Sequence, residues 1–276
     1  MARQEFSWAG WRLAAYYVLL NGCVQGALWL ALPVGWGYLT ASVFGLSLTL
    51  GSVRLRAHLT IKRPMGFLRL WGIVAVLFSV QLVSFVMANL VGYAKLMLGV
   101  ADRGPGMYVY VCLLAPILEE LLFRGMLMRC AEPFGKRFAI FSTAAVFGIY
   151  HCSLTQSPFA FALGCVLGYV AVEYSLIWAI ILHLFNNLVI SDWLPRLSEW
   201  LLGELADLMV WGTVAVFSVA ALVILVCRQN AIAGYLRRNK GSAGGWKCVV
   251  CAPGMWVLAL TLIGFTLWNI LKSRLC

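Results

Sequence analysis

Five polar side chains of types that support hydrolysis or proton transfer lie inside strongly apolar segments of the sequence. They are Glu119, Glu120, His151, His183 and Asn187. A charged side chain near the centre of a bilayer costs about 2.5–3.5 kcal/mol on insertion scales, so it needs a compensating partner or a function. Carboxyl and imidazole groups in such places can transfer protons, hold a metal ion or activate a nucleophile.

The two adjacent glutamates have different neighbours along the sequence. Arg124 follows Glu120 by about one helical turn, so the two side chains can pair on one helix face. Glu119 points about 100° away from Glu120 and has no cation at helical spacing. Pro116 lies about one turn before Glu119 and can kink the helix there. We therefore expect Glu120 to pair with Arg124, and Glu119 to face a polar cavity.

Two further segments place aromatic, imidazole and amide groups one helical turn apart. In FGIYH, Phe147 and His151 share a helix face, and in HLFNN, His183 and Asn187 share one. Together with Glu119, these residues predict a polar cavity formed by three helices. Taken singly, each could instead be a hydrogen-bonding contact between helices, and the Glu120–Arg124 pair could be only structural.

The elements that must position these residues are membrane-spanning helices. The chain has 276 residues, of which 63% are hydrophobic and only 11% are charged. Apolar runs of about 18 or more residues recur, which excludes a soluble protein with one large core. The net charge of +11 comes mostly from Lys and Arg in short loops. This pattern favours the positive-inside rule over nucleic-acid binding as its explanation.

We predict an all-α, polytopic transmembrane helix bundle of about eight to nine spans, with an intramembrane polar cavity. The expected spans are roughly 10–32, 34–52, 70–94, 106–130, 138–152, 158–172, 174–190, 208–227 and 249–271. They form a single membrane domain over 1–276, in which 106–190 contains the candidate site. The three spans between 138 and 190 are short, and short spans are tolerated where they border a cavity.

The distribution of loop charge predicts a cytoplasmic N-terminus. Basic clusters follow the second, fourth and eighth expected spans, and all of them then fall on one side of the membrane. Their members are Arg54, Arg56, Lys62, Arg63, Arg69, Arg129, Lys136, Arg137, Arg228, Arg237, Arg238, Lys240 and Lys247. The segment 192–208 is amphipathic and predicts an interfacial helix on the outer surface. We expect an integral multi-pass protein with its first span retained, in the plasma membrane if the source is bacterial.

The polar residues resemble the motifs of the CPBP family, the CAAX-processing and bacteriocin-processing membrane proteins. That family includes CAAX endopeptidases and many bacterial proteins described as abortive-infection or immunity proteins. Its motifs are EExxxR, FxxxH and HxxxN or HxxxD. Here they occupy 119–124, 147–151 and 183–187, in that order. The resemblance covers roughly 106–190, and the rest of the chain lies outside it.

This resemblance implies an intramembrane glutamic endopeptidase that needs no cofactor. Glu119 would act as the general base on a water molecule, and His151 would help to position or activate that water. His183 and Asn187 would donate hydrogen bonds to the developing oxyanion. Peptide hydrolysis needs an activated water and preorganised donors of this kind.

The resemblance also implies supporting residues and a membrane-associated substrate. Glu120 and Arg124 would hold the helix and shape the electric field around Glu119, and Phe147 would support the site. The substrate would be a membrane-associated or lipidated peptide or protein, in contact with the bilayer. A prenylated protein, a peptide pheromone or a bacteriocin leader would fit this description equally well.

Two other proteolytic mechanisms remain open at the level of sequence. Glu119, His151 and His183 are of the types that form a two-histidine, one-glutamate zinc site, although no HExxH motif is present. Loss of activity with a chelator and its return with zinc would favour that site. A thiol protease could use Cys152 beside His151, but adjacent helical residues diverge by about 100°.

Two readings outside proteolysis also remain open. A non-catalytic membrane scaffold or immunity protein could retain the same motifs, and its function would survive the Glu119→Ala substitution. A transporter could use intramembrane Glu and His residues as a proton relay. The sequence shows no internal repeat of the kind found in the common transporter architectures.

Overall fold

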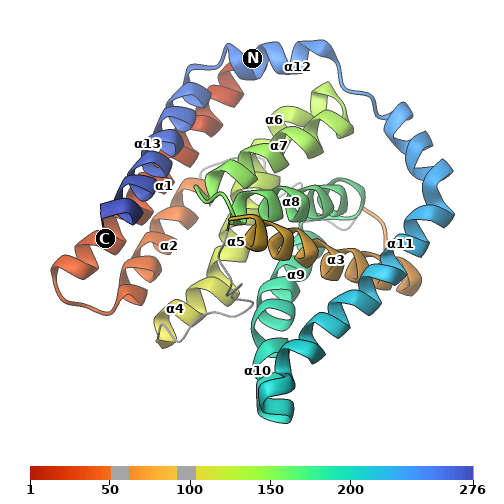
Figure 1. Cartoon of the computed structure of the whole chain (residues 1–276). Helices are drawn as coiled ribbons and strands as arrows, with labels where there is room; N and C mark the ends of the chain where they lie inside the picture. The colour runs from red at the N-terminus through yellow and green to blue at the C-terminus, as the bar shows by residue number, and fades with distance from the viewer. Residues whose placement is uncertain (51–61, 92–103, 276) are drawn as a thin grey trace.

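The computed structural model describes residues 1–50, 62–91 and 104–275, and all regular structure in these ranges is helical (Figure 1). Helices satisfy their own backbone hydrogen bonds, as a lipid environment requires. In chain order the elements are α1 (Ala2–Trp29), α2 (Val34–Leu50), α3 (Phe67–Val91), α4 (Pro105–Val109), η2 (Tyr110–Leu114), α5 (Ala115–Glu119), η3 (Glu120–Leu127), α6 (Met128–Ala131), η4 (Glu132–Phe134), α7 (Lys136–Tyr150), α8 (Gln156–Glu173), α9 (Leu176–Phe185), η5 (Asn186–Trp193), α10 (Leu194–Leu202), η6 (Gly203–Leu205), α11 (Ala206–Arg238), α12 (Ala243–Val250) and α13 (Pro253–Leu275). The predicted all-α class is confirmed.

Fewer helices than expected are long and apolar enough to cross a membrane. The described residues contain four such helices, or five if one pair bent by 64° is counted as a single span. They are Phe67–Met87, Pro105–Phe134, Gln156–Glu173 and Leu176–Arg238, with the bent pair Gly244–Val250 and Pro253–Trp268 as the fifth. The prediction of about eight to nine spans is therefore too high.

The excess in the predicted count has identifiable physical causes. The helices α2 and α7 have 17 and 15 residues, which is shorter than the helix needed for a hydrocarbon layer of about 30 Å. The expected spans 174–190 and 208–227 both fall in the stretch Leu176–Arg238, which counts once although it turns at Gly203, where α10 packs against α11. The helix α1 has 28 residues, but polar side chains such as Arg12 and Asn21 interrupt its apolar sequence.

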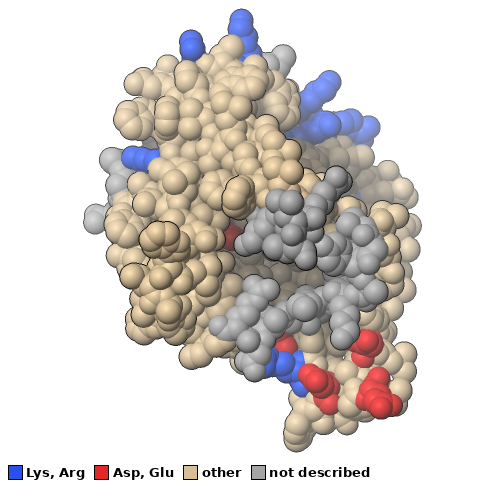
Figure 2. Space-filling view, turned by 60° about the vertical axis from the view of Figure 1, so that its left-hand side comes forward, with Lys and Arg blue, Asp and Glu red and all other residues tan. Residues whose placement is uncertain are grey.

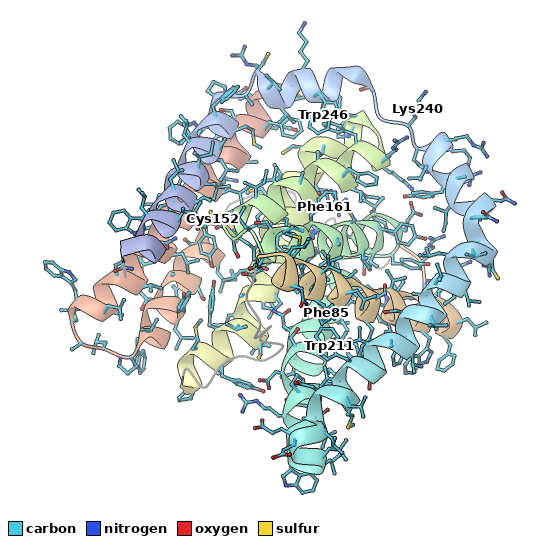
Figure 3. All side chains as sticks on the ribbon, in the orientation of Figure 1. Phe85, Cys152, Phe161, Trp211, Lys240 and Trp246 are labelled. Atoms are coloured by element: carbon cyan, nitrogen blue, oxygen red, sulfur yellow. The ribbon has the colours of Figure 1, made fainter. Side chains whose placement is uncertain are left out.

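The centre of the bundle is formed by α7, α8 and α9, and α3 packs on α8 and carries α11 on its other side (Figure 1). Aromatic pairs hold α11 against α3. The rings of Phe78 and Phe217 stack with their centroids 4.3 Å apart, and those of Phe85 and Trp211 lie 4.8 Å apart (Figure 3). Aromatic pairs of this kind add to the free energy of apolar burial. The site residues thus lie on helices that are covered on several sides.

The first helix lies beside the last helix of the chain. Both α2 and α13 pack along α1 (Figure 1). The close approach of α1 and α13 depends on glycine, because a Cβ atom added at Gly10 would collide with the backbone of Gly254. Arg3 Nε donates to the carbonyl oxygen of Cys251 at 2.6 Å, so the N-terminus lies where α12 meets α13.

Charged side chains gather at two opposite ends of the molecule. Figure 2 shows most of the visible Lys and Arg toward the upper end and most Asp and Glu at the lower end, where one basic patch lies beside them. The basic end includes the residues that follow α11, and the acidic end includes α10 and the turn η6. Arg54 and Arg56, which we assigned to a basic loop, lie outside the described residues.

Candidate active site

The candidate residues lie at junctions between α-helical and π-helical segments. Glu119 is the last residue of α5, Glu120 is the first residue of η3, and Asn187 lies in η5. The segments η2, η3 and η5 are all π-helical. Such segments are rare and occur frequently at functional sites, because they turn side chains away from the regular α-helical direction. The sequence did not predict them.

Glu120 is a fully buried anion with two partners on one oxygen. Its Oε1 accepts from Arg124 Nη1 at 2.7 Å and lies 2.9 Å from His183 Nδ1. The side chains of Glu120 and Arg124 are 0% and 1% exposed. Arg124 Nη2 also donates to the carbonyl oxygen of Gly164 at 3.3 Å, which ties this pair to α8. The predicted pairing of Glu120 with Arg124 is therefore confirmed.

His183 lies between the two glutamates. Because a carboxylate can only accept, its Nδ1 donates the proton of the contact with Glu120. The opposite nitrogen, Nε2, lies 3.7 Å from Glu119 Oε2, too far for a hydrogen bond but within ion-pair range. The side chain of Glu119 is 19% exposed, whereas that of His183 is 3% exposed. Glu119 is thus the carboxylate that an incoming molecule can reach.

Phe147 connects both histidines to the buried ion pair. The guanidinium carbon of Arg124 lies 4.5 Å above the centre of its ring. The ring centroids of His151 and His183 lie 4.9 and 6.0 Å from that of Phe147, and both imidazoles are nearly perpendicular to it. Edge-to-face and cation–π contacts of this kind fix ring orientation. The structure therefore places Phe147 at the centre of the predicted set.

His151 ends α7 and is oriented by its own helix. Its Nδ1 lies 2.9 Å from the carbonyl oxygen of Phe147, so this nitrogen donates and Nε2 remains for another partner. The imidazole is partly exposed. Among the residues described, no hydrogen bond joins His151 to Glu119. The positioning of one water molecule by both side chains therefore stays a prediction.

Cys152 is the residue after His151 and takes part in a different contact. Its φ angle of 48° lies in the left-handed region, where α7 ends. Its Sγ donates to the carbonyl oxygen of Leu262 in α13 at 3.4 Å (Figure 3). The thiol is therefore held by α13, which gives no support to a thiol nucleophile paired with His151.

Asn187 belongs to a chain of amide hydrogen bonds that the sequence did not reveal. Its Nδ2 donates to the carbonyl oxygen of Val111 in η2, and its Oδ1 accepts from Asn186, both at 3.0 Å. Asn186 in turn accepts from Gln81 Nε2 of α3 at 3.0 Å. A primary amide has two N–H donors, so Asn187 keeps one for another acceptor. The one signal for this network in the sequence was Gln81, a polar residue inside the apolar helix α3.

Three buried tyrosines from other elements interact electrostatically with Glu119. Tyr16 of α1, Tyr110 of η2 and Tyr150 of α7 are 2%, 7% and 6% exposed. The phenol group of each interacts electrostatically with the carboxyl group of Glu119. Sequence reasoning does not select these residues, because a buried tyrosine in an apolar helix has the same local pattern as an ordinary core residue.

The described residues contain no group of three His, Cys, Asp or Glu side chains that could hold a metal ion. Glu119 and His183 are close together, and the second nitrogen of His183 faces Glu120. The set of Glu119, His151 and His183 that a zinc site would need is thus not assembled in this structure.

One family of known proteins matches the segment that carries these residues. Residues 103–189 match the family described as Rce1-like, type II CAAX prenyl endopeptidase. No curated protein and no solved structure matches the chain. The matched segment contains all three motifs, whereas α1, α2, α3 and the helices from α11 onwards lie outside it. Residues 103–189 of this membrane protein are therefore similar to the Rce1-like family, as the motifs predicted.

Proposed function

We propose that this chain is an intramembrane glutamic endopeptidase that cleaves a membrane-associated or lipidated peptide with a water molecule activated by Glu119. The observation that carries the proposal is the contrast between the two adjacent glutamates. Glu120 is fully buried and bound to Arg124 and His183, whereas Glu119 is partly exposed beside His183. One carboxylate is thus committed to structure, and the other is available for chemistry.

The first half of the reaction adds water to the scissile carbonyl group. Glu119 takes a proton from the water as its oxygen forms a bond to the carbonyl carbon, and the carbonyl electron pair moves onto oxygen. His183 Nε2 and the free N–H of Asn187 would donate to this oxyanion. His151 would hold the water through its Nε2, since its Nδ1 is bound to Phe147.

The second half breaks the carbon–nitrogen bond. The oxyanion collapses to a carboxyl group, the amine leaves, and Glu119 returns the proton to the leaving nitrogen. This sequence conserves atoms and electrons with one water and no further reactant. No metal or organic cofactor takes part in it.

Glu120 has a defined part in this mechanism without touching the substrate. Its Oε1 accepts a hydrogen bond from His183 Nδ1. The donor to the oxyanion must therefore be the N–H group at Nε2, so both ring nitrogens of His183 carry a proton in this mechanism. A buried carboxylate that fixes the orientation and protonation of a histidine is a recurring arrangement in hydrolases. Arg124 balances the charge of Glu120, and Phe147 holds the ring of His183.

The surface of the molecule supports a defined orientation in the membrane. The N-terminus lies at the basic end, because Arg3 binds the backbone where α12 meets α13. The positive-inside rule would place this end in the cytoplasm, and in a bacterium the membrane would be the plasma membrane. The substrate would then reach Glu119 from the bilayer or its interface, and nucleic acid is not a partner.

Comparative proteomics of membrane peptides tests the proposal. Cells carrying the wild-type chain are compared with cells carrying Glu119→Gln, which preserves side-chain shape but removes the base. We expect termini that are present with the wild type to be absent with the variant, and purified variant protein to lose about 10²–10⁴-fold in cleavage rate. Equal termini in both cell lines would contradict proteolysis and favour a scaffold.

Addition of a chelator to the purified wild-type protein distinguishes the zinc mechanism. We expect the cleavage rate to be unchanged by the chelator and by added zinc. Loss of activity that zinc restores would replace Glu119-activated water by metal-activated water.

A further inference from the structure

Three side-chain amides form a continuous chain of hydrogen bonds that ends at the candidate site. Gln81 Nε2 donates to Asn186 Oδ1, and Asn186 Nδ2 donates to Asn187 Oδ1. Asn187 Nδ2 donates to the carbonyl oxygen of Val111, and each of the three contacts is 3.0 Å long. Gln81 and Asn186 are each 1% exposed, so water does not compete for the bond between them.

The direction of this chain is fixed at its end in η2. A backbone carbonyl group can only accept, so the atom of Asn187 that faces Val111 is the amide nitrogen. The oxygen of Asn187 then faces Asn186, which presents its own nitrogen there and turns its oxygen toward Gln81. Each amide in the chain therefore has one favoured orientation, because reversal of one amide alone would bring two acceptors or two donors face to face.

The helix α3 positions Gln81 through an aromatic neighbour on the same face. Phe78 lies about one turn earlier and stacks on Phe217 of α11, with ring centroids 4.3 Å apart. The centroid of Phe78 also lies 6.5 Å from that of Phe185, the residue before Asn186. The amide of Gln81 is thus held beside the junction of α9 and η5.

The chain of amides satisfies a requirement of the site. An oxyanion donor is effective when it is oriented before the reaction, because the cost of turning it during the reaction would reduce its effect. The oxygen of Asn187 and one of its N–H groups are both occupied, which restricts rotation of this amide. A glutamine in an apolar helix is costly to bury unless it is hydrogen-bonded, and Gln81 spends its donor on Asn186.

We propose that Gln81, acting through Asn186, is a positioning residue that holds the amide of Asn187 with its free N–H group available to the oxyanion. The role rests on the proposed endopeptidase function, and it requires no contact between Gln81 and the substrate. Gln81 lies outside residues 103–189, so α3 completes the site from a part of the chain that the family match does not include.

The first test measures cleavage by Gln81→Met in the purified full-length protein. The substrate is a quenched fluorescent peptide that contains a cleavage site found by the proteomics above. Methionine keeps the length of the side chain and removes its amide. We expect kcat to fall about tenfold with KM within twofold of the wild type, because the oxyanion develops only during the reaction. An unchanged kcat would contradict the role.

A double-mutant cycle with Asn187→Ala shows whether Gln81 acts through Asn187. We expect Asn187→Ala alone to lower kcat by about 10²–10³-fold, as the loss of an oxyanion donor does. In that background Gln81→Met should change kcat by less than about twofold, because the amide that it positions is absent. A tenfold fall in both backgrounds would show that Gln81 supports the fold alone, and it would overturn the role.

A second variant separates orientation from stability. Gln81→Met leaves the buried oxygen of Asn186 without its donor, so we expect its melting temperature to fall. Gln81→Met combined with Asn186→Leu removes both partners, and we expect its melting temperature to lie closer to that of the wild type. Its kcat should stay at least about tenfold low, since neither residue then holds Asn187. Recovery of kcat together with stability would contradict the positioning role.

Two controls match the substitution in place and in chemistry. Ser79→Ala removes a polar group from α3 whose hydroxyl donates within its own helix, to the carbonyl oxygen of Val76 at 2.7 Å. Gln156→Met makes the same exchange at the exposed start of α8. We expect both variants to keep the kcat of the wild type. A fall in either as large as that of Gln81→Met would remove the specific role of Gln81.

The outcomes distinguish this inference from the proposed function. If Glu119→Gln abolishes cleavage and Gln81→Met keeps the kcat of the wild type, the endopeptidase stands and the positioning role is wrong. If Asn187→Ala keeps the kcat of the wild type, the role is also wrong, because there is no donor to position. If Glu119→Gln retains activity, the proposed function fails, and the role of Gln81 fails with it.

Discussion

Two of the glutamates that bind cations, Glu120 and Glu173, have very different surroundings. Glu120 lies inside the bundle with Arg124 from its own helical segment, and both side chains are almost completely buried. Glu173 lies at the end of α8, where it binds Lys136 at 2.8 Å, Arg63 at 3.3 Å and Tyr235 at 2.9 Å. These cations are 46% and 41% exposed.

The difference between the two clusters shows what each charge does. The Glu173 cluster joins α8 to α7, α11 and the segment before α3, so it ties elements together at the basic end. Exposed ion pairs contribute little to stability because water competes for both charges. The Glu120 cluster joins neighbouring residues of one segment to His183, and its charge is shielded from water. This cluster holds the imidazole of His183 in one orientation.

Removal of the cation from the Glu120 cluster is the test of this comparison with the largest expected effect. Arg124→Met leaves the carboxylate of Glu120 buried without its cation, so we expect a loss of about 3–5 kcal/mol in the free energy of unfolding. The measurement is thermal unfolding in detergent, followed by the intrinsic fluorescence of the tryptophans. A melting temperature close to that of the wild type would contradict the structural importance of the pair.

A double substitution separates the stability of the Glu120 cluster from its function. Glu120→Gln with Arg124→Met removes both charges, so we expect stability to recover toward that of the wild type. Cleavage is expected to stay at least about 10²-fold below the wild type, because His183 loses the carboxylate that orients it. Full recovery of both stability and cleavage would show that Glu120 has no part in catalysis.

Phe147→Leu tests the contact between the ion pair and the histidines. The smaller side chain loses the ring that lies under Arg124 and beside both imidazoles. We expect a loss of about 1–3 kcal/mol in stability, together with a lower kcat. Unfolding and cleavage are measured on the same preparation, with Phe161→Leu as a control from the partly exposed surface of α8. Equal effects of the two substitutions would remove the special role of Phe147.

Lys136→Met is the matched experiment at the Glu173 cluster, and it should have the smallest effect. Lys136 is half exposed, and Glu173 keeps Arg63 and Tyr235 after the substitution. We expect a change of about 0.2–1 kcal/mol in the free energy of unfolding and an unchanged cleavage rate. A loss as large as that of Arg124→Met would show that the two clusters do not differ as described.

Local rules were sufficient to predict several features of the site. The pairing of Glu120 with Arg124 and the contact of Phe147 with His151 both follow from the four-residue spacing of a helix. The all-α class followed from the apolar composition. The span count was less successful, because hydropathy alone does not show that helical segments follow one another without a loop from Leu176 to Arg238, or that α7 has only 15 residues.

Other features of the site depend on tertiary contacts and local irregularity. The π-helical segments η3 and η5 change the directions of side chains that regular helical spacing would predict. The hydrogen bond from Gln81 to Asn186, which continues to Asn187, joins residues 105 positions apart. Tyr16 interacts electrostatically with Glu119 because α1 packs against α2 and η3, and nothing in its local sequence indicates this interaction.

The contact between α1 and α13 has a consequence for the order in which the protein can mature. The first helix leaves the ribosome long before the last, yet Gly10 of α1 packs directly on Gly254 of α13. The thiol of Cys152, next to His151, also binds the backbone of α13. While the chain is still being synthesised, α1 and the end of α7 therefore lack their final neighbour. The nascent protein would reach its cleavage-competent arrangement only after α13 has been inserted, which would protect neighbouring membrane proteins during biosynthesis.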